Sequence, residues 1–473
     1  MKKGFRVLSL VTALFMVLSL AACKGGSGDK TGGSSDTVSE GKIEDWIGAG
    51  SDYVQSIPDV SGTGDNLIDK VVDVPPPQVD LKGQTLTLFC WQDKNADTTT
   101  DDIANFKTFT GATLKIDYCD WGSYSQTFLT KCLSGAAPDL FAVRAEDNPQ
   151  LMYKNMFLDI TDKINFDDIL WQGIKSKNSE NYLDGKLYQV TTSGFVGRFI
   201  MYNKKMFTKE GVETPDVAYE AGTWTWEKLI EYAKKFTQDS NGDGQTDQFG
   251  FGGPFHIILD CMQSSAKTDY VVKKDKLHEL TLDDPKLTQA ADLLDRMYNV
   301  DKIMNDDGTA LNDFAKGKVA MYIDGSWALN PNPLKQMHKD GEVSLVPIPK
   351  WNGSNEAISA GNWNMFAVPN KSKNVDAAIA YINMTRYMAI SRDAHAVSSK
   401  KYKERGFTDK ESEYMSLAAA NIYHSNWIGV PDMSQTVYEC MGRIRAGEKW
   451  ATLKDEYKPK FQQQVDALNG LVK

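Results

Sequence analysis

The sequence predicts an α/β fold, because short strand-like runs alternate along the chain with helix-like runs. A β-rich run at 84–90 is followed by helical spacing at 104–110, and alternating residues at 113–118 predict a second strand. A helical stretch at 124–134 then leads to the apolar run 139–143, which suits a strand buried in a parallel sheet. This order of strand, helix and strand is typical of parallel sheets covered by helices.

Length and composition limit the architecture and the partners. The stretch from Gly83 to the end is about 390 residues long, which is too long for one hydrophobic core, so two lobes are expected. The whole chain is 41% hydrophobic and 25% charged, with a formal net charge of −10. Nucleic acids and anionic surfaces bind clustered Lys and Arg, so this charge argues against them and favours a neutral or cationic small molecule.

Residues 1–22 have the order of a secretory signal peptide. Lys2, Lys3 and Arg6 precede an uncharged apolar stretch that ends at Ala22. A membrane-spanning helix needs roughly 20 apolar residues, so we expect cleavage rather than the alternative of a permanent transmembrane anchor.

The cleavage region points to a lipid anchor. Leu20-Ala21-Ala22-Cys23 resembles the lipobox of bacterial lipoproteins. The resemblance implies that Cys23 is acylated, with palmitate among its lipids, and becomes the mature N-terminus. The chain is then expected on the extracellular side of the cell membrane, or on the periplasmic side if the cell has an outer membrane.

Residues 23–80 are predicted to be a flexible tether behind this lipid. They begin with a Gly/Ser-rich stretch and reach three consecutive prolines at 75–77, and such segments bury too little apolar surface to fold alone. A coil of roughly 55 residues spans about 40 Å. Trp46 and Tyr53 are exceptions, since both side chains can pack on the folded part.

The cysteines beyond Cys23 form no recognisable framework. Their number is odd, their spacing is wide, and the sequence has no CxxC or Cys/His cluster with zinc spacing. We therefore expect most of them to be buried as small apolar groups. A single disulfide pair among them is the alternative. These cysteines are Cys90, Cys119, Cys132, Cys261 and Cys440.

Five sequence blocks carry a family resemblance. They are Ala136-Ala-Pro-Asp139-Leu-Phe, Met201-Tyr-Asn-Lys-Lys-Met-Phe207, Thr223-Trp224-Thr-Trp226-Glu-Lys-Leu, Phe314-Ala-Lys-Gly317-Lys-Val-Ala-Met-Tyr-Ile-Asp324-Gly-Ser-Trp327 and Phe366-Ala-Val-Pro369. In this order they resemble the extracellular solute-binding proteins of ABC importers, the family that includes the maltose-binding protein. The resemblance covers residues 83–473.

The resemblance implies a type II periplasmic-binding-protein fold with two lobes. The lobes are expected at 83–197 with 365–422 and at 198–360 with 423–473, joined by hinge crossings near 195–200, 360–365 and 420–430. A ligand between two such lobes makes different contacts in the open and closed states, which lets it shift the equilibrium between them. The partner implied in the membrane is an ABC permease, and the chain is expected to be a monomer.

Aromatic residues that follow predicted strands or lie at the crossings are candidates for ligand contact. Their faces stack on the apolar C–H face of a sugar ring and exclude water around it, so they predict a carbohydrate ligand. Large aromatics are more often core, which we expect for Trp224, Trp226 and Trp450. The candidates are Trp91, Trp121, Tyr124, Trp327, Trp363 and Trp427.

Polar residues in the same places are candidate partners for sugar hydroxyls, because carboxylates, Arg and Asn form planar, bidentate hydrogen bonds. For Arg144 and Glu146, a salt bridge within the protein is the alternative. The candidates are Asp93, Arg144, Glu146, Arg198, Asp324 and Asn362.

The stretch 239–250 has the spacing of a calcium-binding loop. Side chains with oxygen atoms alternate along it, and Gly244 at the sixth position allows the sharp turn. Gly250 occupies the twelfth position, where a bidentate Glu is usual, so another ligand must come from elsewhere. Without metal, the same string forms a turn with Asx hydrogen bonds. The candidate ligands of a structural Ca²⁺ are Asp239, Asn241, Asp243, Gln245 and Asp247.

Enzyme motifs are missing from the sequence, which has no GxSxG, HExxH, phosphate loop or GxGxxG after a strand. We therefore expect a binding protein that needs no cofactor for chemistry. Polyamines, peptides, metal chelates and acidic sugars are alternative ligands, and signalling to a sensor kinase is an alternative to transport. Arg144 and Arg198 together would favour an anionic sugar.

Overall fold

The computed structural model describes residues 72–472 apart from 94, 96, 172, 306–307, 355, 357 and 424. The predicted signal peptide, Cys23 and residues 24–71 of the tether, with Trp46 and Tyr53, lie outside these residues. Within the described part, no helix combines the length and the apolar composition that crossing a membrane requires.

The first sheet is built around the strands that the sequence predicts. Its order is β15-β14-β3-β1-β2, and β6 also pairs with β14. The strands β1, β2 and β3 are parallel, whereas β14 is antiparallel to β3 and to β6. The bounds are β1 Thr85–Cys90, β2 Thr113–Tyr118, β3 Leu140–Val143, β6 Val190–Val196, β14 Ser359–Ala367 and β15 Ile422–Tyr423.

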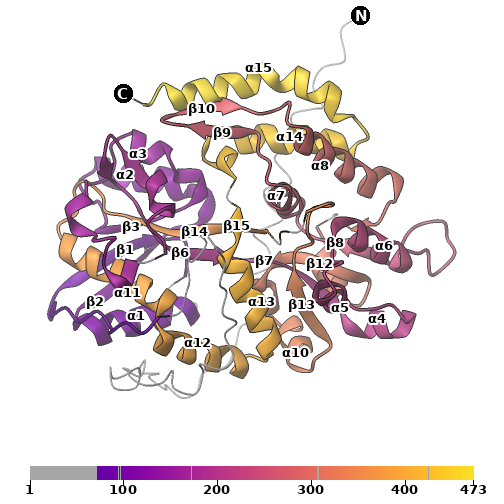
Figure 1. Cartoon of the computed structure of the whole chain (residues 1–473), viewed down its shortest axis with the longest axis horizontal. Helices are drawn as coiled ribbons and strands as arrows, with labels where there is room; N and C mark the ends of the chain where they lie inside the picture. The colour runs from indigo at the N-terminus through magenta and orange to yellow at the C-terminus, as the bar shows by residue number, and fades with distance from the viewer. Residues whose placement is uncertain are drawn as a thin grey trace, which may run out of the picture. The chain divides into compact units, whose positions relative to one another are not determined.

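Helices that pack against this sheet include α1 (Asp97–Thr110) and α11 (Val375–Ile390) (Figure 1). The helix α2 (Tyr124–Leu133) places Phe128 against Phe141 of β3. The predicted helix at 104–110 is confirmed, but it begins seven residues earlier. The added residues are mostly Asp and Thr, so they lack the apolar spacing by which a helix is recognised.

The second sheet has the order β11-β8-β12-β7-β13. The strand β8 is parallel to both β11 and β12, while β7 runs antiparallel to β12 and β13. The bounds are β7 Arg198–Asn203, β8 Phe249–Gly252, β11 Met304–Asn305, β12 Val319–Gly325 and β13 Val343–Pro347. The mixed α/β class and the two-lobed architecture are therefore confirmed.

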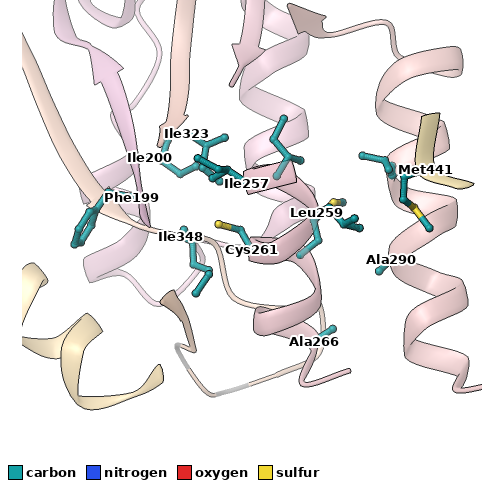
Figure 2. Packing of buried hydrophobic residues seen from close by; sticks show 14 of the residues in the cluster. Phe199, Ile200, Ile257, Leu259, Cys261, Ala266, Ala290, Ile323, Ile348 and Met441 are labelled. Carbon is teal, nitrogen blue, oxygen red and sulfur yellow. The ribbon is translucent and has the colours of Figure 1, made fainter. Parts of the chain in front are cut away.

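The helix α7 (Phe255–Ala266) is largely buried, from Ile257 to Ala266 apart from Asp260. Figure 2 shows Cys261 facing the side of Phe199 and Ile348, while Leu259 points toward Ala290 and Met441. The last two residues belong to α8 (Pro285–Asp295) and α14 (Met433–Arg445). The helix thus packs between the sheet and a second helical layer.

The remaining elements complete the lobes. The helices are α3 Gln150–Tyr153, α4 Lys204–Glu210, α5 Pro215–Glu220, α6 Trp226–Phe236, α9 Ala310–Ala315, α10 Leu334–Lys339, α12 Arg392–Glu404, α13 Asp409–Ala420 and α15 Trp450–Asn469. The small strands are β4 Tyr182–Leu183, β5 Lys186–Leu187, β9 Val271–Lys274 and β10 Leu277–Leu280.

The chain passes between the sheets at three places. The first is Gly197, between β6 and β7, and the third follows β15, before α14. Both match the predicted crossings. The second runs over 348–358, earlier than predicted, because β14 already pairs with β15 from Ser359 onward. The lobe boundaries stay predictions.

The two halves also touch through a pair of hairpins. Along the chain, the β9–β10 hairpin comes between β8 and β11 of the second sheet. Its Lys276 forms an ion pair with Asp184 in the β4–β5 turn. The carbonyl of Lys276 also accepts a hydrogen bond from the hydroxyl of Tyr153, at 3.4 Å.

Several predictions about the core are confirmed. Trp224, Trp226 and Trp450 are fully buried. The indole of Trp224 donates to the carbonyl of Pro347 at 2.9 Å, and that of Trp226 donates to the Ser265 hydroxyl at 2.7 Å. All five described cysteines are buried and free, so the alternative of a disulfide pair among them is wrong.

Candidate ligand-binding site

One group of aromatic side chains lies at the carboxyl ends of β1 and β2. Trp91 follows β1 directly, and Trp121 begins the short helix η2 (Trp121–Ser123) after β2. Their rings meet edge to face, with centroids 5.2 Å apart and an interplanar angle of 80°. Trp121 stays 45% exposed, so it presents a face to solvent.

Arg144, just after β3, supports this group from inside. Its guanidinium carbon lies 4.7 Å from the ring centroid of Trp121 and 4.5 Å from that of Tyr124. Its Nε donates to a carboxylate oxygen of Asp147 at 2.8 Å. Its terminal nitrogens donate to the Trp121 carbonyl at 2.5 Å and to the Ser125 hydroxyl at 2.6 Å. The structure thus shows the salt-bridge alternative, because this buried guanidinium is committed to the protein.

Glu146 lies beside the same group, in the helix η3 (Ala145–Asp147). Burial raises the pKa of its carboxyl, against smaller lowering effects of the Arg144 charge and of a hydrogen bond from Trp121. Its Oε2 is buried and has no hydrogen-bond partner among the described residues. A hydroxyl group of a ligand is a suitable donor for such an oxygen.

A second group repeats this arrangement on the other sheet. Trp327, in the helix η8 (Ser326–Leu329) after β12, is 39% exposed. The guanidinium carbon of Arg198, at the start of β7, lies 4.8 Å from its ring centroid. Arg198 Nε is buried and has no hydrogen-bond partner within the part of the chain that the structure describes.

Asp324 supplies the carboxyl of this second group. It accepts hydrogen bonds from the backbone N–H of Gly325 at 2.7 Å and from the Tyr322 hydroxyl at 3.2 Å. Burial raises the pKa of Asp324, while these bonds, the charge of Arg198 and a hydrogen bond from Trp327 oppose the rise. Each group therefore combines an exposed indole, a guanidinium over its ring and a carboxyl that accepts its hydrogen bond.

Two aromatic side chains on helices lie close together near the charged residues of these groups. Tyr438 of α14 is 37% exposed, and its ring centroid lies 6.0 Å from that of His256 on α7. Burial, with the nearby carboxylates of Asp260 and Glu146, raises the pKa of Tyr438 to about 12, against the opposing charge of Arg198. The ring centroid of Tyr438 also lies 6.1 Å from that of Trp427.

Sequence reasoning did not find Tyr438, His256 or Asp260. These positions follow no strand and stand in no family block. On an amphipathic helix, the spacing of apolar residues shows the buried face, but it does not show which boundary residues turn toward a cleft.

The strand β14 carries Asn362 and Trp363, both half-buried, opposite Phe195 and Gly194 of β6. Trp363 packs against both hydrophobic clusters, and the Lys177 ammonium lies 5.3 Å from its ring centroid. This indole is therefore packed against the protein on the first sheet.

Asp93 is exposed after β1, where its carboxylate accepts the backbone N–H of Asn95 at 2.7 Å. Its charge also contributes to raising the pKa of Tyr118, after the larger effects of the Asp120 hydrogen bond, of burial and of the Asp120 charge. Asp93 thus lies at the rim of the first group.

Two candidates for ligand contact need correction. Tyr124 is completely buried, and its hydroxyl donates to the carbonyl oxygens of Phe89 and Ala142, each at 2.8 Å. Trp427 is 1% exposed, and its indole donates to the Gln263 amide oxygen at 3.2 Å. Both rings are surrounded by protein, so they support the site and offer no face to a ligand.

The loop at 239–247 is folded as a turn held by its own acidic side chains. The Asp239 carboxylate accepts the backbone N–H groups of Gly242, Asp243 and Gly244, at 2.7–3.2 Å. Asn241 Oδ1 accepts from Asp243 N at 2.9 Å. Asp243 Oδ1 accepts from Gln245 N at 2.8 Å, and Asp247 accepts from Ser240 N at 3.0 Å.

The loop meets the requirements of a calcium-binding site only in part. Among the described residues, no group of three or more His, Cys, Asp or Glu side chains is arranged to hold a metal. A Cβ at Gly250 would overlap the backbone of Ala233, so the twelfth position cannot carry a carboxylate. The Asx turn is therefore present, and calcium binding stays a prediction.

The fold and the site define a two-lobed binding protein. The sequence profile of the bacterial extracellular solute-binding proteins matches residues 93–384, so the chain belongs to that family. The family and its structural neighbours are substrate-binding proteins, and the chain is accordingly not an enzyme. No curated protein matches the chain.

Several solved structures share the fold. The GacH receptor of Streptomyces glaucescens, solved unliganded and with acarbose, aligns with a TM-score of 0.60 at 17% identity over 83% of this chain and 99% of its own. The sugar-binding protein MalE of Xanthomonas citri aligns with a TM-score of 0.60 at 15% identity over 82% and 97%. An ABC substrate-binding protein of Listeria monocytogenes, in complex with cycloalternan, gives 0.59 at 18% identity over 82% and 98%.

Proposed function

We propose that this protein captures a sugar or oligosaccharide between its lobes and delivers it to an ABC importer. The observation that carries the proposal is the pair of exposed indoles, Trp121 after β2 of the first sheet and Trp327 after β12 of the second. Each is backed by a guanidinium group and a carboxyl group, which hold a flat ring in a fixed orientation. Fixed aromatic faces suit the C–H faces of sugar rings.

The ligands named for similar solved structures support a carbohydrate as the ligand. These proteins were solved with cycloalternan, acarbose, maltotriose and mannotriose. An anionic sugar is the weaker alternative, because Arg144 already binds Asp147 and is not free to bind a ligand carboxylate. A polyamine is the stronger rival, since Glu146, Asp260 and Asp324 place carboxyl groups beside aromatic faces.

The membrane part of the proposal rests on the sequence and on the family. A lipid on Cys23 would keep the protein, acting as a monomer, at the outer face of the membrane that holds the permease. Tethering raises the effective concentration of a binding protein near its partner. A flexible linker leaves the lobes free to open and close while the lipid stays in the bilayer.

A thermal-shift screen tests the ligand class. A chain lacking residues 1–23 is heated with maltotriose, mannotriose, cycloalternan, galacturonate oligomers, spermidine or short peptides. A ligand that binds only the folded state raises the melting temperature. We expect the neutral oligosaccharides to do so, and stabilisation by spermidine or peptides alone would overturn the carbohydrate assignment.

A further inference from the structure

The indole of Trp327 lies against two glycine residues. A Cβ added at Gly197 would lie 2.7 Å from Cη2 of this indole and closer still to Cζ3. A Cβ added at Gly325 would overlap the same six-membered ring at Cδ2, Cε3 and Cζ3. Carbon atoms in proteins pack no closer than about 3.5 Å, so neither position accepts a side chain while the ring stays in place.

The backbone does not require glycine at either position. Gly325 has φ −73° and ψ 159°, which is extended backbone that any residue adopts. Gly197 is likewise not among the residues with positive φ. Space for the ring is therefore what these two glycines supply. By contrast, a Cβ at Gly442 in α14 would meet no atom within 4 Å.

We propose that Gly197 and Gly325 are positioning residues that set ligand specificity through Trp327. The two glycines form a flat surface, which we call the bed, and the indole packs against it with Arg198 over the ring. The exposed part of the ring is thereby held at a fixed position in the site. Any side chain on the bed would push the ring into the volume that a sugar ring occupies. This inference takes Trp327 to contact the ligand, and that contact rests on the proposed function.

The bed also connects Trp327 to the movement of the lobes. Gly197 is the single residue between β6 of the first sheet and β7 of the second. Its carbonyl accepts the backbone N–H of Ser326, next to the indole, at 3.0 Å. A change of backbone at this crossing therefore moves the surface on which the ring lies.

The first test follows the ring without any ligand. The chain is labelled with 5-fluorotryptophan, and the ¹⁹F resonance of Trp327 is assigned with the variant Trp327→Phe. We expect this resonance to move in Gly197→Ala and in Gly325→Ala, and to keep its position in the control Gly442→Ala. An unmoved Trp327 resonance in both bed variants overturns the inference, whether or not any sugar binds.

The second test is a double-mutant cycle, which isolates the part of an effect that passes through a neighbour. We expect Gly325→Ala to lower the melting temperature, and Gly325→Ala with Trp327→Ala to melt at the temperature of Trp327→Ala alone. If the double variant keeps the full loss caused by Gly325→Ala, the glycine serves another purpose and the inference fails.

Ligand binding completes the cycle, with maltotriose as the probe. Gly325→Ala should weaken its binding about fivefold or more, as expected for a lost stacking contact, and should add nothing in the Trp327→Ala background. A full additional loss in that background contradicts the inference. If maltotriose and the other sugars do not bind at all, the proposed function fails, while the resonance and the melting temperatures still decide the inference.

Discussion

The guanidinium carbon of Arg198 lies 4.8 Å from the ring centroid of Trp327, and Arg144 holds the same relationship to Trp121 at 4.7 Å. A cation over an aromatic face attracts the ring and limits its rotation. The two lobes thus present indoles that are already oriented before a ligand arrives. A ligand that meets an oriented ring loses less entropy on binding.

Removing an indole should weaken binding. Trp327→Ala and Trp363→Ala are each expected to reduce the affinity for the solute by about 1 kcal/mol or more, the scale of a lost aromatic contact. Isothermal titration calorimetry measures the change. Leu133→Ala is the control, since this side chain is 83% exposed. Unchanged affinity in both tryptophan variants would assign these rings to packing alone.

Breaking the Arg144–Asp147 pair should destabilise the fold. Both side chains are buried, and Arg144→Met leaves the Asp147 carboxylate without its partner. Removing one partner of a buried pair costs about 3–5 kcal/mol. Urea unfolding measures the free energy of unfolding. The matched control is Lys175→Met, whose partner Asp167 is 82% exposed, and we expect no measurable change there.

The free energy of unfolding should decrease at acidic pH because of Glu411. Burial would raise the pKa of this carboxyl, but hydrogen bonds from His338, Ser344 and the Thr408 backbone lower it to about 2, from an ordinary value of 4.5. Between these values the unfolded chain binds a proton that the folded chain does not. The contribution of Glu411 is therefore complete above pH 4.5 and is lost as the pH falls toward 2.

Urea titrations at pH 6, 4 and 3 measure this dependence. The variant Glu411→Gln should be less stable at pH 6 and should lose less stability on acidification. An unchanged slope in this variant would show that other carboxyl groups produce the acid response.

Calcium should stabilise the chain if the loop at Asp239 binds it. EDTA is then expected to lower the melting temperature, and added Ca²⁺ to restore it, because an ion that binds the folded state shifts the unfolding equilibrium. Asp239→Ala should abolish the response and also cost stability by itself, since three backbone N–H groups lose their acceptor. A melting temperature that is indifferent to both reagents would leave the turn as the only role of the loop.

Cys23→Ala should release the protein from the membrane without changing its affinity for the solute. Cell fractionation followed by immunoblotting measures the location, and titration of the released protein measures the affinity. Protein that stays in the membrane fraction would contradict the lipid anchor and favour an uncleaved transmembrane segment. The control is Cys119→Ala, which removes a buried thiol of the folded part.

Much of the fold was predictable, because the patterns of strands such as β1, which begins with alternating Thr and Leu, and β3, which is entirely apolar, are local. Trp121 and Trp327 were found for a similar reason, since both lie within three residues of the end of a strand. The roles of the residues that contact these indoles were harder to assign. Arg144 and Glu146 are two positions apart, yet one is fully bonded within the protein and the other keeps a buried oxygen without a partner. That difference depends on tertiary neighbours such as Ser125 and Trp121, which accept hydrogen bonds from Arg144.

The buried aromatics show the same limit. Trp427 follows a strand as Trp327 does, but α7 and Tyr270 enclose it. Position along the chain identifies the end of a strand, whereas the packing of distant helices decides whether a ring there meets solvent.

The hairpin contact between Asp184 and Lys276 bears on how fast the solute exchanges. Both side chains are about half exposed, so dissolved ions screen their attraction. Separating the halves has to break this ion pair together with the hydrogen bond from Tyr153 to the Lys276 carbonyl. We therefore expect the ionic strength of the medium to affect the rate at which the two halves separate, through a contact that lies outside the candidate site.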